Sequence, residues 1–233
     1  MKTLGLIGGM SWESTLPYYR LINETVRDTL GGLHSAHLLL YSVNFHEIEA
    51  MQRAGDWAAA GQAMADAARA LATAGADGLV LCTNTMHKVA DAIEAAVPLP
   101  LLHIADPTAD AVRAAGCSTI GLLATRFTME QDFYIERLRH AGLQVLVPEA
   151  GERDDVHRII YDELCCGVID AQSRQRYRDV MASLVTRGAQ GIVLGCTEIS
   201  LLVSAADASV PLFDTTALHA RAAARWALAD VTN

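Results

Sequence analysis

The sequence has 233 residues, of which 52% are hydrophobic and 19% are charged, and its formal net charge is −9. A chain of this length folds as one large domain or two small ones, and its apolar content suffices for a buried core. The acidic balance argues against a nucleic-acid partner and against docking on anionic lipid, because both need a basic face. We therefore expect a globular protein with neither partner.

No segment predicts a membrane helix or a secretory signal. A transmembrane helix needs about 18 nearly uncharged apolar residues. The longest apolar stretch runs from Trp57 to Ala76 and contains Asp66 and Arg69. The apolar residues after Lys2 are too few and too rich in glycine for the core of a signal peptide. The sequence therefore predicts a soluble cytoplasmic protein.

Eight short apolar segments predict β-strands, because each is bounded by glycine, proline or polar turn residues. The segments are 4–7, 38–41, 78–81, 100–104, 119–124, 143–148, 192–194 and 210–213. Apolar residues at helical spacing fill the intervals, for example over 57–71 and 89–97, and Thr128 with Gln131 predicts a capping box that opens a helix through Leu138. Regular alternation of this kind indicates an α/β fold with parallel sheets, strands buried on both faces, and helices on either side.

The second half of the chain repeats the pattern of the first. Segment 3–7 recurs at 119–123, segment 76–83 recurs at 189–197, and segment 100–102 recurs at 211–213. The general likeness of buried strands explains the apolar runs, but not the Cys-Thr pair that follows two of them. The repeat therefore predicts two similar α/β lobes that are related by a pseudo-two-fold axis.

The five cysteines offer more than one chemistry. They are Cys82, Cys117, Cys165, Cys166 and Cys196. Their spacing forms neither a CxxC pair nor a His/Cys metal cluster, and a disulfide framework is not expected in the cytoplasm. Each cysteine is therefore either a small buried apolar residue or a reactive thiol.

Cys82 and Cys196 occupy equivalent places, since each follows a buried strand and precedes a predicted helix. The positive end of a helix lowers the pKa of a nearby thiol. Two such thiols on opposite faces of a substrate carbon could racemise it without a cofactor, one as general base and the other as general acid. Two alternatives stay open. The cysteines could be there only because small side chains fit at crowded strand ends, or they could form a redox pair. A substrate-sized gap would hold the sulfurs too far apart for a disulfide, which argues against the redox pair.

A glycine turn, Gly8-Gly9, follows the first predicted strand. The spacing of its glycines differs from the dinucleotide-binding fingerprint, and no Gly-Lys-Ser/Thr follows as in a P-loop. The turn either presents backbone N–H groups to a substrate carboxylate or simply joins a strand to a helix.

Three ordered motifs carry a resemblance to a known family. They are Gly8-Gly9-Met10-Ser11-Trp12-Glu13-Ser14-Thr15 with Tyr18-Tyr19, then Cys82-Thr83-Asn84-Thr85-Met86-His87, and finally Gly195-Cys196-Thr197-Glu198-Ile199. The chain resembles the aspartate/glutamate racemase family over essentially its whole length, and looks closest to the bacterial branch that acts on L-aspartate, L-glutamate or a broader set of amino acids.

The resemblance implies a cofactor-independent amino-acid racemase, usually a homodimer, with its active site between two lobes. It implies a first lobe of residues 1–105 plus 209–233 and a second lobe of residues 106–208. Cys82 and Cys196 would be the catalytic acid/base thiols. Substrate-binding residues would be Met10, Gln52, Thr83, Asn84, Thr85, Thr197 and Glu198, although Glu198 could equally cap its helix.

One departure from the family bears on the substrate. Many dicarboxylate-specific members have a lysine, which would hold the distal carboxylate, where this chain has Cys165. Arg53, beside Gln52, could replace that cation, and the substrate range could be relaxed. Two other functions stay open: a maleate-isomerase-like or hydantoin-racemase-like enzyme in which Cys82 is a nucleophile, and a non-catalytic two-lobed protein that binds small molecules.

Overall fold

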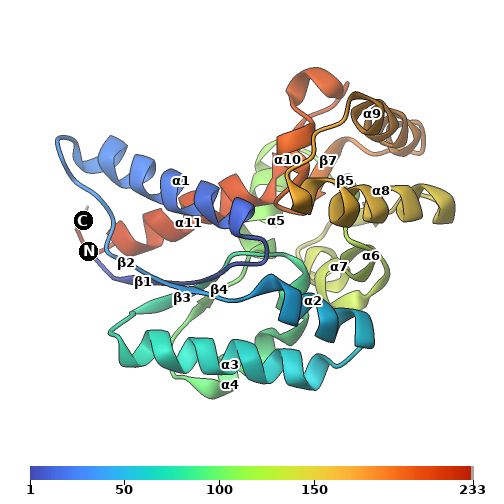
Figure 1. The fold of residues 1–233 in the computed structure, drawn as a ribbon. Coiled ribbons are helices and arrows are strands. Elements are labelled where there is room, and N and C mark those ends of the chain that lie inside the picture. Colours follow the sequence, from blue (N-terminus) through green and yellow to red (C-terminus); the bar gives the residue numbers. More distant parts are fainter. Residues whose placement is uncertain (232–233) are drawn as a thin grey trace. The chain divides into compact units, whose positions relative to one another are not determined.

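The computed structural model describes residues 1–231, which divide into two compact units (Figure 1). The first unit is Met1–His103 with the C-terminal segment from His219, and the second is Ile104–Leu218. Each contains one four-stranded sheet, with strand orders β2-β1-β3-β4 and β6-β5-β7-β8. All pairings are parallel. Relative to their order along the chain, the strands are thus arranged in the same way in both units. This confirms the predicted α/β fold with two similar parallel sheets.

In the first unit, two layers of helices cover the sheet. The strands are β1 (Leu4–Gly8), β2 (Leu38–Ser42), β3 (Gly78–Leu81) and β4 (Leu101–Leu102), and the helices are α1 (Trp12–Leu30), α2 (Phe45–Ala54), α3 (Trp57–Thr73), the 3₁₀ helix η1 (Thr85–Val89), α4 (Ala90–Ala96) and most of α11 (Thr215–Leu228). Helices α1 and α11 cover one face of the sheet, and α3 and α4 cover the other (Figure 1). Alternate residues of β1 and β3 therefore enter two separate apolar clusters.

The second unit has one continuous apolar core around its sheet. Its strands are β5 (Thr119–Ala124), β6 (Gln144–Leu146), β7 (Gly191–Gly195) and β8 (Leu212–Asp214). Its helices are α5 (Ala105–Ala114), α6 (Arg126–Glu130), α7 (Asp132–His140), α8 (Ala150–Asp162), the 3₁₀ helix η2 (Leu164–Cys166), α9 (Ala171–Thr186), α10 (Ile199–Leu202), the 3₁₀ helix η3 (Ala205–Asp207) and the start of α11. Helices α8 and α9 contact β5, α5 contacts β8, and α7 contacts β6.

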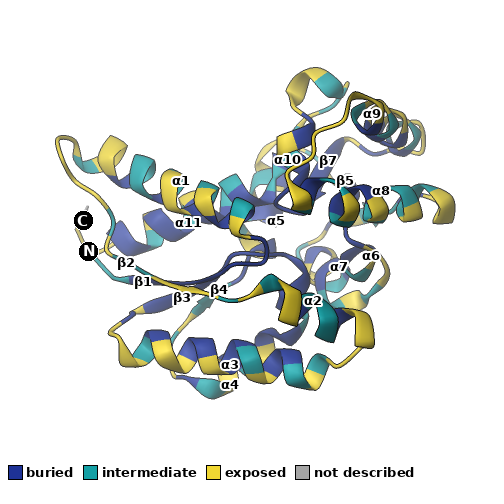
Figure 2. Ribbon diagram, viewed as in Figure 1, coloured by how far each residue is buried: buried dark blue, intermediate teal, exposed yellow. Residues whose placement is uncertain are grey.

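All eight predicted strands are present, but burial on both faces holds only for the central ones. Strands β1, β3, β5 and β7 are buried almost throughout, whereas β2 is exposed over its last three residues (Figure 2). The outer strands lack a neighbour on one side, so their flanks meet solvent. The shortness of β4 and β6 corrects the predictions of strands at 100–104 and 143–148.

The predicted capping box at Thr128 and Gln131 is wrong. Thr128 lies inside α6, and its backbone N–H donates to the side chain of Thr125, which caps that helix. Gln131 occupies the N-cap position of the next helix, α7, without a side-chain capping bond. The extended backbone of Gln131 divides the segment into two short helices.

The boundary between the units also differs from the one implied by the resemblance. Residues 209–218 lie in the second unit, because β8 pairs in parallel with β7, Phe213 beside Val193. The hydroxyl of Thr215 then donates to the carbonyl of Leu194 at 2.8 Å and fixes the start of α11 to the same sheet. The chain enters the first unit only at His219, in the second turn of α11.

The glycine turn after β1 has a structural explanation. Gly9 has a φ of 92°, and a Cβ there would lie 2.3 Å from the carbonyl oxygen of Val43. Its backbone N–H donates to the hydroxyl of Thr15, in α1, at 2.9 Å. This N–H is therefore bonded within the chain, where it helps to join β1 to α1.

Candidate active site

Cys82 directly follows β3, and its side chain is fully buried. Its backbone N–H donates to the carbonyl of Ile7 at 2.9 Å, and its thiol donates weakly to the carbonyl of Val80 at 3.8 Å. Burial raises the pKa of Cys82. The predicted lowering by a helix end is therefore wrong, since the helical turn η1 begins only at Thr85 and is a short 3₁₀ segment.

Several other predicted site residues of the first unit lie at or beside η1. Thr83, Asn84 and Thr85 are buried and connect Cys82 to this turn. The buried Gln52 amide, from α2, donates to the sulfur of Met86 in η1 at 3.1 Å. Met10 packs in the same apolar cluster as Met86. The structure thus places Gln52 in contact with η1, and Met10 in the apolar cluster to which Met86 belongs.

Arg53 differs from its neighbour Gln52. Its side chain is 72% exposed and pairs with Glu49 of the same helix at 3.6 Å. An exposed pair of this kind contributes little to stability. Within the described residues, the ion pair that the structure gives Arg53 is therefore with Glu49, and not with the residues around η1.

A cluster of buried histidines lies in the same unit as Cys82. His87 Nδ1 lies 2.7 Å from the carbonyl oxygen of Thr83, and its ring centroid is 4.3 Å from that of His103. Nε2 of His219 lies 2.6 Å from the carbonyl oxygen of Leu102, so it donates there, and Nδ1 then accepts from the hydroxyl of Tyr18 at 2.8 Å. His87 thus makes a local hydrogen bond within the segment that follows Cys82.

Cys196 directly follows β7 in the second unit and is also buried. Its thiol donates to Oε2 of Glu198 at 3.1 Å, and the hydroxyl of Thr197 donates to the same oxygen at 2.7 Å. Burial raises the pKa of Cys196, and the nearby Glu198 carboxylate raises it further. The predicted lowering is wrong here too, since α10 has only four residues and follows three positions later.

Cys165 belongs to the surroundings of Cys196. It lies in η2, which contacts α10, and it packs against the apolar core that contains Cys196 and Tyr177. Its thiol also raises the pKa of Cys196, after burial and Glu198. Cys166, by contrast, is exposed and donates to the carbonyl of Tyr161 at 3.7 Å.

Tyr177 was missed by sequence reasoning. It is fully buried on α9, and its hydroxyl donates to the carbonyl of Val156 at 3.2 Å. Burial raises its pKa, with further contributions from Cys196, Glu163, Cys165 and Glu198. Its helical spacing with Val180 and Leu184 predicts a core residue and gives no sign of the neighbouring thiols.

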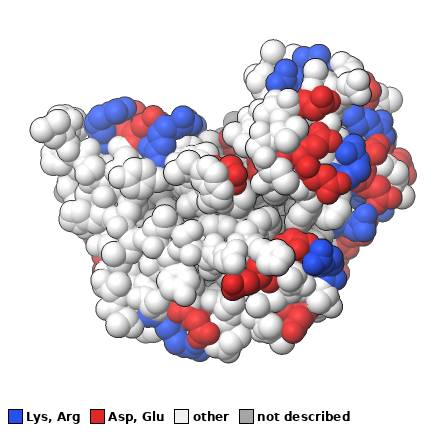
Figure 3. All heavy atoms as spheres, in the orientation of Figure 1, with Lys and Arg blue, Asp and Glu red and all other residues white. Residues whose placement is uncertain are grey.

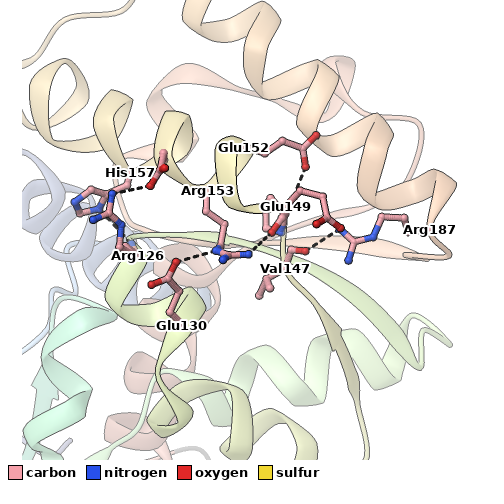
Figure 4. Close-up of polar contacts among 10 residues, drawn as sticks. Arg126, Glu130, Val147, Glu149, Glu152, Arg153, His157 and Arg187 are labelled. Atoms are coloured by element: carbon pink, nitrogen blue, oxygen red, sulfur yellow. Dashed lines mark hydrogen bonds and ion pairs between the residues drawn. The ribbon is translucent and has the colours of Figure 1, made fainter.

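A polar network fixes the segments around the N-terminus of α8 in the second unit (Figure 4). Arg153 pairs with Glu130 of α6 at 2.9 Å and donates to the carbonyl of Pro148 at 2.7 Å. Arg187 donates to the carbonyl of Val147 at 2.9 Å. The network thus connects α6, α8 and the end of α9 with the loop after β6. On the face of the molecule drawn in Figure 3, basic and acidic side chains lie interspersed.

His157, in this network, predicts a pH dependence of stability. Its Nδ1 accepts from the backbone N–H of Arg126 at 3.2 Å, and burial, followed by the Arg126 charge, lowers its pKa from 6.5. The unfolded chain therefore binds a proton that the folded chain does not as pH falls below about 6.5. The stability that neutral His157 contributes is present above this pH and is lost as pH falls through its lowered folded pKa.

We expect the difference in unfolding free energy between the wild type and His157→Asn to shrink between pH 7.5 and pH 5. Urea titrations followed by circular dichroism measure it, with the exposed His140→Asn as a matched control. An equal difference at both pH values would contradict this role of His157.

Comparisons with known proteins bear on the family and the fold. The family model for Asp/Glu/Hydantoin racemase matches residues 7–223. This chain belongs to that family. The resemblance predicted from the motifs, and with it the prediction of a racemase-family enzyme, is confirmed.

Three relatives extend over nearly the whole chain. The broad-specificity amino-acid racemase RacX of Bacillus subtilis (strain 168) is 22% identical, over 94% of this chain and 95% of its own length. A crystal structure from Yersinia pestis, assigned provisionally as an Asp/Glu racemase, is 61% identical, with a TM-score of 0.91 over 98% of this chain and 100% of that chain. An aspartate racemase homologue from Pyrococcus horikoshii OT3 is 35% identical, with a TM-score of 0.83 over 97% of this chain and 99% of that chain.

Among residues 1–231, no helix is both long and apolar enough to cross a membrane. The cytoplasmic location stays a prediction.

Proposed function

We propose that this family member racemises free amino acids at Cα, with Cys82 and Cys196 as its two acid/base groups. The observation that carries the proposal is their equivalence: each thiol directly follows a buried central strand, β3 or β7, of two sheets with the same strand order. A threonine follows each cysteine, so both the thiol and its neighbouring hydroxyl are repeated.

In the proposed reaction, a thiolate on one cysteine removes the Cα proton, breaking the C–H bond and forming S–H. The thiol of the other cysteine then donates its proton to the opposite face of the same carbon and becomes a thiolate. The roles exchange when the substrate has the other hand. Burial makes either thiolate scarce, but a thiol with a raised pKa gives a stronger base, as the weakly acidic Cα proton requires.

The polar residues beside the thiols would hold the substrate. Thr83, Asn84, Thr85 and Thr197 offer hydroxyl and amide groups to the α-carboxylate and the amino group, and Met10 with Gln52 would line the pocket. We assign no cofactor to the reaction, because general acid/base chemistry by two thiols needs none. Glu198 was predicted to bind the substrate or to cap its helix, and its contact with Cys196 supports a different role, argued below.

Deuterium exchange tests this function. The protein is dialysed against a chelator and incubated in D₂O with single L- or D-amino acids and no added cofactor. We expect deuterium at Cα together with formation of the other enantiomer, measured by mass spectrometry after chiral chromatography. Absence of both across a panel of twenty amino acids would contradict the proposal. Turnover of a hydantoin or of maleate in parallel assays would instead favour the alternative enzymes.

We also propose that the chain forms a homodimer, because the first unit exposes large apolar side chains. Trp12, Leu16 and Tyr19 are spaced along one face of α1 and are each more than half exposed. Leu40 and Tyr41 of the outer strand β2 are exposed as well. Exposed apolar side chains at helical spacing along one face of a helix are typical of protein interfaces.

We expect the double substitution Leu16→Glu/Tyr19→Glu to produce a monomer, because it places charges where apolar area would be buried. Light scattering coupled to size-exclusion chromatography measures the mass. Val168→Glu is the matched control, since Val168 is an exposed apolar residue of the second unit. An unchanged dimer mass for the double variant, or a monomeric wild type, would argue against this surface.

A further inference from the structure

The two halves of the repeat differ at one chemically important position. Two residues after Cys196 the chain has Glu198, whereas two residues after Cys82 it has Asn84. Both side chains are almost fully buried. A carboxylate can accept and return a proton near neutral pH, whereas an amide cannot. The repeat therefore equips only one of the two thiols with a neighbouring carboxylate.

The contacts of the two thiols reflect this difference. The Cys196 thiol donates to Oε2 of Glu198 at 3.1 Å, a short distance for a hydrogen bond from sulfur. The hydrogen bond that the structure gives to the Cys82 thiol within the described chain goes to a backbone carbonyl at 3.8 Å. Thr197 donates to the same Oε2 atom at 2.7 Å and so holds the carboxylate against the sulfur.

We infer that Glu198 is the proton-exchange partner of Cys196, so that one thiol works as a Cys–Glu pair while Cys82 works alone. Transfer along the hydrogen bond breaks the S–H bond of Cys196 and forms an O–H bond on Glu198. It yields a thiolate beside a neutral carboxylic acid with no change in total charge. Glu198 thus acts through Cys196 as a positioning residue, and this inference rests on the proposed function.

The proton balance closes over one turnover. The Cys196 thiolate takes the Cα proton, Cys82 delivers its own proton to the opposite face, and the Cys82 thiolate remains. When the product leaves, water supplies a proton to Cys82 and takes one from Glu198. The pair then returns to a Cys196 thiol that donates to a carboxylate.

Other titratable groups near the pair come from neighbouring elements. The thiol of Cys165 in η2 and the phenol of Tyr177 on α9 interact electrostatically with Cys196. Glu163, at the end of α8, interacts with Tyr177 and is paired with Arg158 at 2.9 Å and with Ser173 at 2.5 Å. Cys165 adds to the raised pKa of Cys196. The structure gives the hydrogen bond with the Cys196 sulfur to Glu198.

Alkylation of Cys196 without substrate tests the inference. Iodoacetamide reacts with the thiolate, and peptide mass spectrometry resolves the labelling rate of each cysteine between pH 5 and pH 10. A shared proton gives the wild type a two-step profile with a plateau through neutral pH, because the fraction of thiolate in the pair is then independent of pH. Glu198→Gln leaves a single step, and its rate falls about tenfold for each pH unit below that step.

A comparison of labelling with turnover decides between proton exchange and simple repulsion. Glu198→Gln removes the negative charge beside the sulfur, so we expect Cys196 to be labelled faster at pH 7 than in the wild type. If the pair shares a proton, racemisation by Glu198→Gln nevertheless falls at least about tenfold, because the thiol has lost its proton acceptor, and Glu198→Asp restores part of it. Racemisation that rises together with the labelling rate would show that Glu198 only repels the thiolate, and would overturn the inference. Thr197→Val removes a donor that favours the charged carboxylate, so we expect the neutral plateau to rise a few-fold. Glu136→Gln, an exposed carboxylate of the same unit, is the control and leaves the profile unchanged.

This test separates failure of the inference from failure of the proposed function. Labelling of Cys196 needs no turnover, so a plateau together with absent racemisation supports the Cys–Glu pair and contradicts the racemase. Racemisation together with a one-step labelling profile in the wild type would support the racemase and contradict the Cys–Glu pair. Circular dichroism of each variant establishes folding, and Glu198→Asp provides a second route if Glu198→Gln is unstable.

Discussion

Replacing either Cys82 or Cys196 by serine is expected to lower racemisation by about 10²–10⁴-fold, the usual contribution of a positioned acid/base group. A serine hydroxyl is a much weaker acid than a thiol, so it neither forms the base nor delivers a proton at neutral pH. A site with one working group cannot protonate the face opposite the one it deprotonates. Chiral chromatography from the L- and D-substrates measures the effect in both directions.

The same variants permit a finer observation. Exchange of Cα hydrogen with D₂O without inversion should survive for one substrate hand in one variant and for the other hand in the other, because each keeps a different base. Cys166→Ser is the matched control, since Cys166 is exposed and has no assigned role. Near wild-type inversion in either active-site variant would contradict the two-base assignment.

The strands and their order of appearance could be predicted because they are encoded locally. The central strands are apolar and end at glycine or polar residues, so the runs at β3 and β5 matched their observed bounds. The repeat added long-range information, since equivalent residues of a repeated sequence occupy equivalent strands. The equivalent strand-end positions of Cys82 and Cys196 follow from that repeat.

The environment of the thiols could not be predicted in the same way. A motif shows that a helical segment follows a cysteine, but not that η1 and α10 are short or that both sulfurs are buried. The direction of the pKa change depends on this burial, and for Cys196 also on a carboxylate oxygen whose side chain the fold turns toward the sulfur.

Contacts between distant segments were also beyond the sequence. The hydrogen bond between Tyr18 and His219 joins residues 201 positions apart. It depends on α11 crossing from the second unit into the first, as does the bond from His219 to Leu102. No periodicity within either segment indicates such a pairing, and no repeat includes His219.

The second large effect concerns substrate range, because a dicarboxylate-specific site needs a cation where the distal carboxylate binds. An unpaired buried carboxylate costs several kcal/mol. At the position where many dicarboxylate-specific members have a lysine, this chain has Cys165, which lies near Cys196 and packs on the same core. Arg53, the other candidate, is largely exposed. We therefore expect an L-aspartate/L-glutamate-type racemase that also accepts neutral side chains.

Values of kcat/KM for glutamate, aspartate, homoserine and methionine test this expectation. The wild type should prefer a dicarboxylate by less than about a thousandfold, which corresponds to roughly 4 kcal/mol. Cys165→Lys should increase that preference by about 10–100-fold, since a charge-assisted hydrogen bond contributes about 1.5–3 kcal/mol. It should also lower the pKa of Cys196, because a cation replaces a thiol that raises it.

Two matched variants separate these effects. Cys165→Met keeps the position neutral and should leave the preference unchanged, so a gain confined to Cys165→Lys is due to the charge. Arg53→Ala reports on the other candidate cation. If it leaves the acidic substrates unaffected, hydroxyl and backbone donors must hold their distal carboxylate. A wild-type preference for dicarboxylates above about a thousandfold, roughly 4 kcal/mol, would contradict the relaxed site. The chain would then have to supply a cation from elsewhere to compensate for the neutral thiol of Cys165.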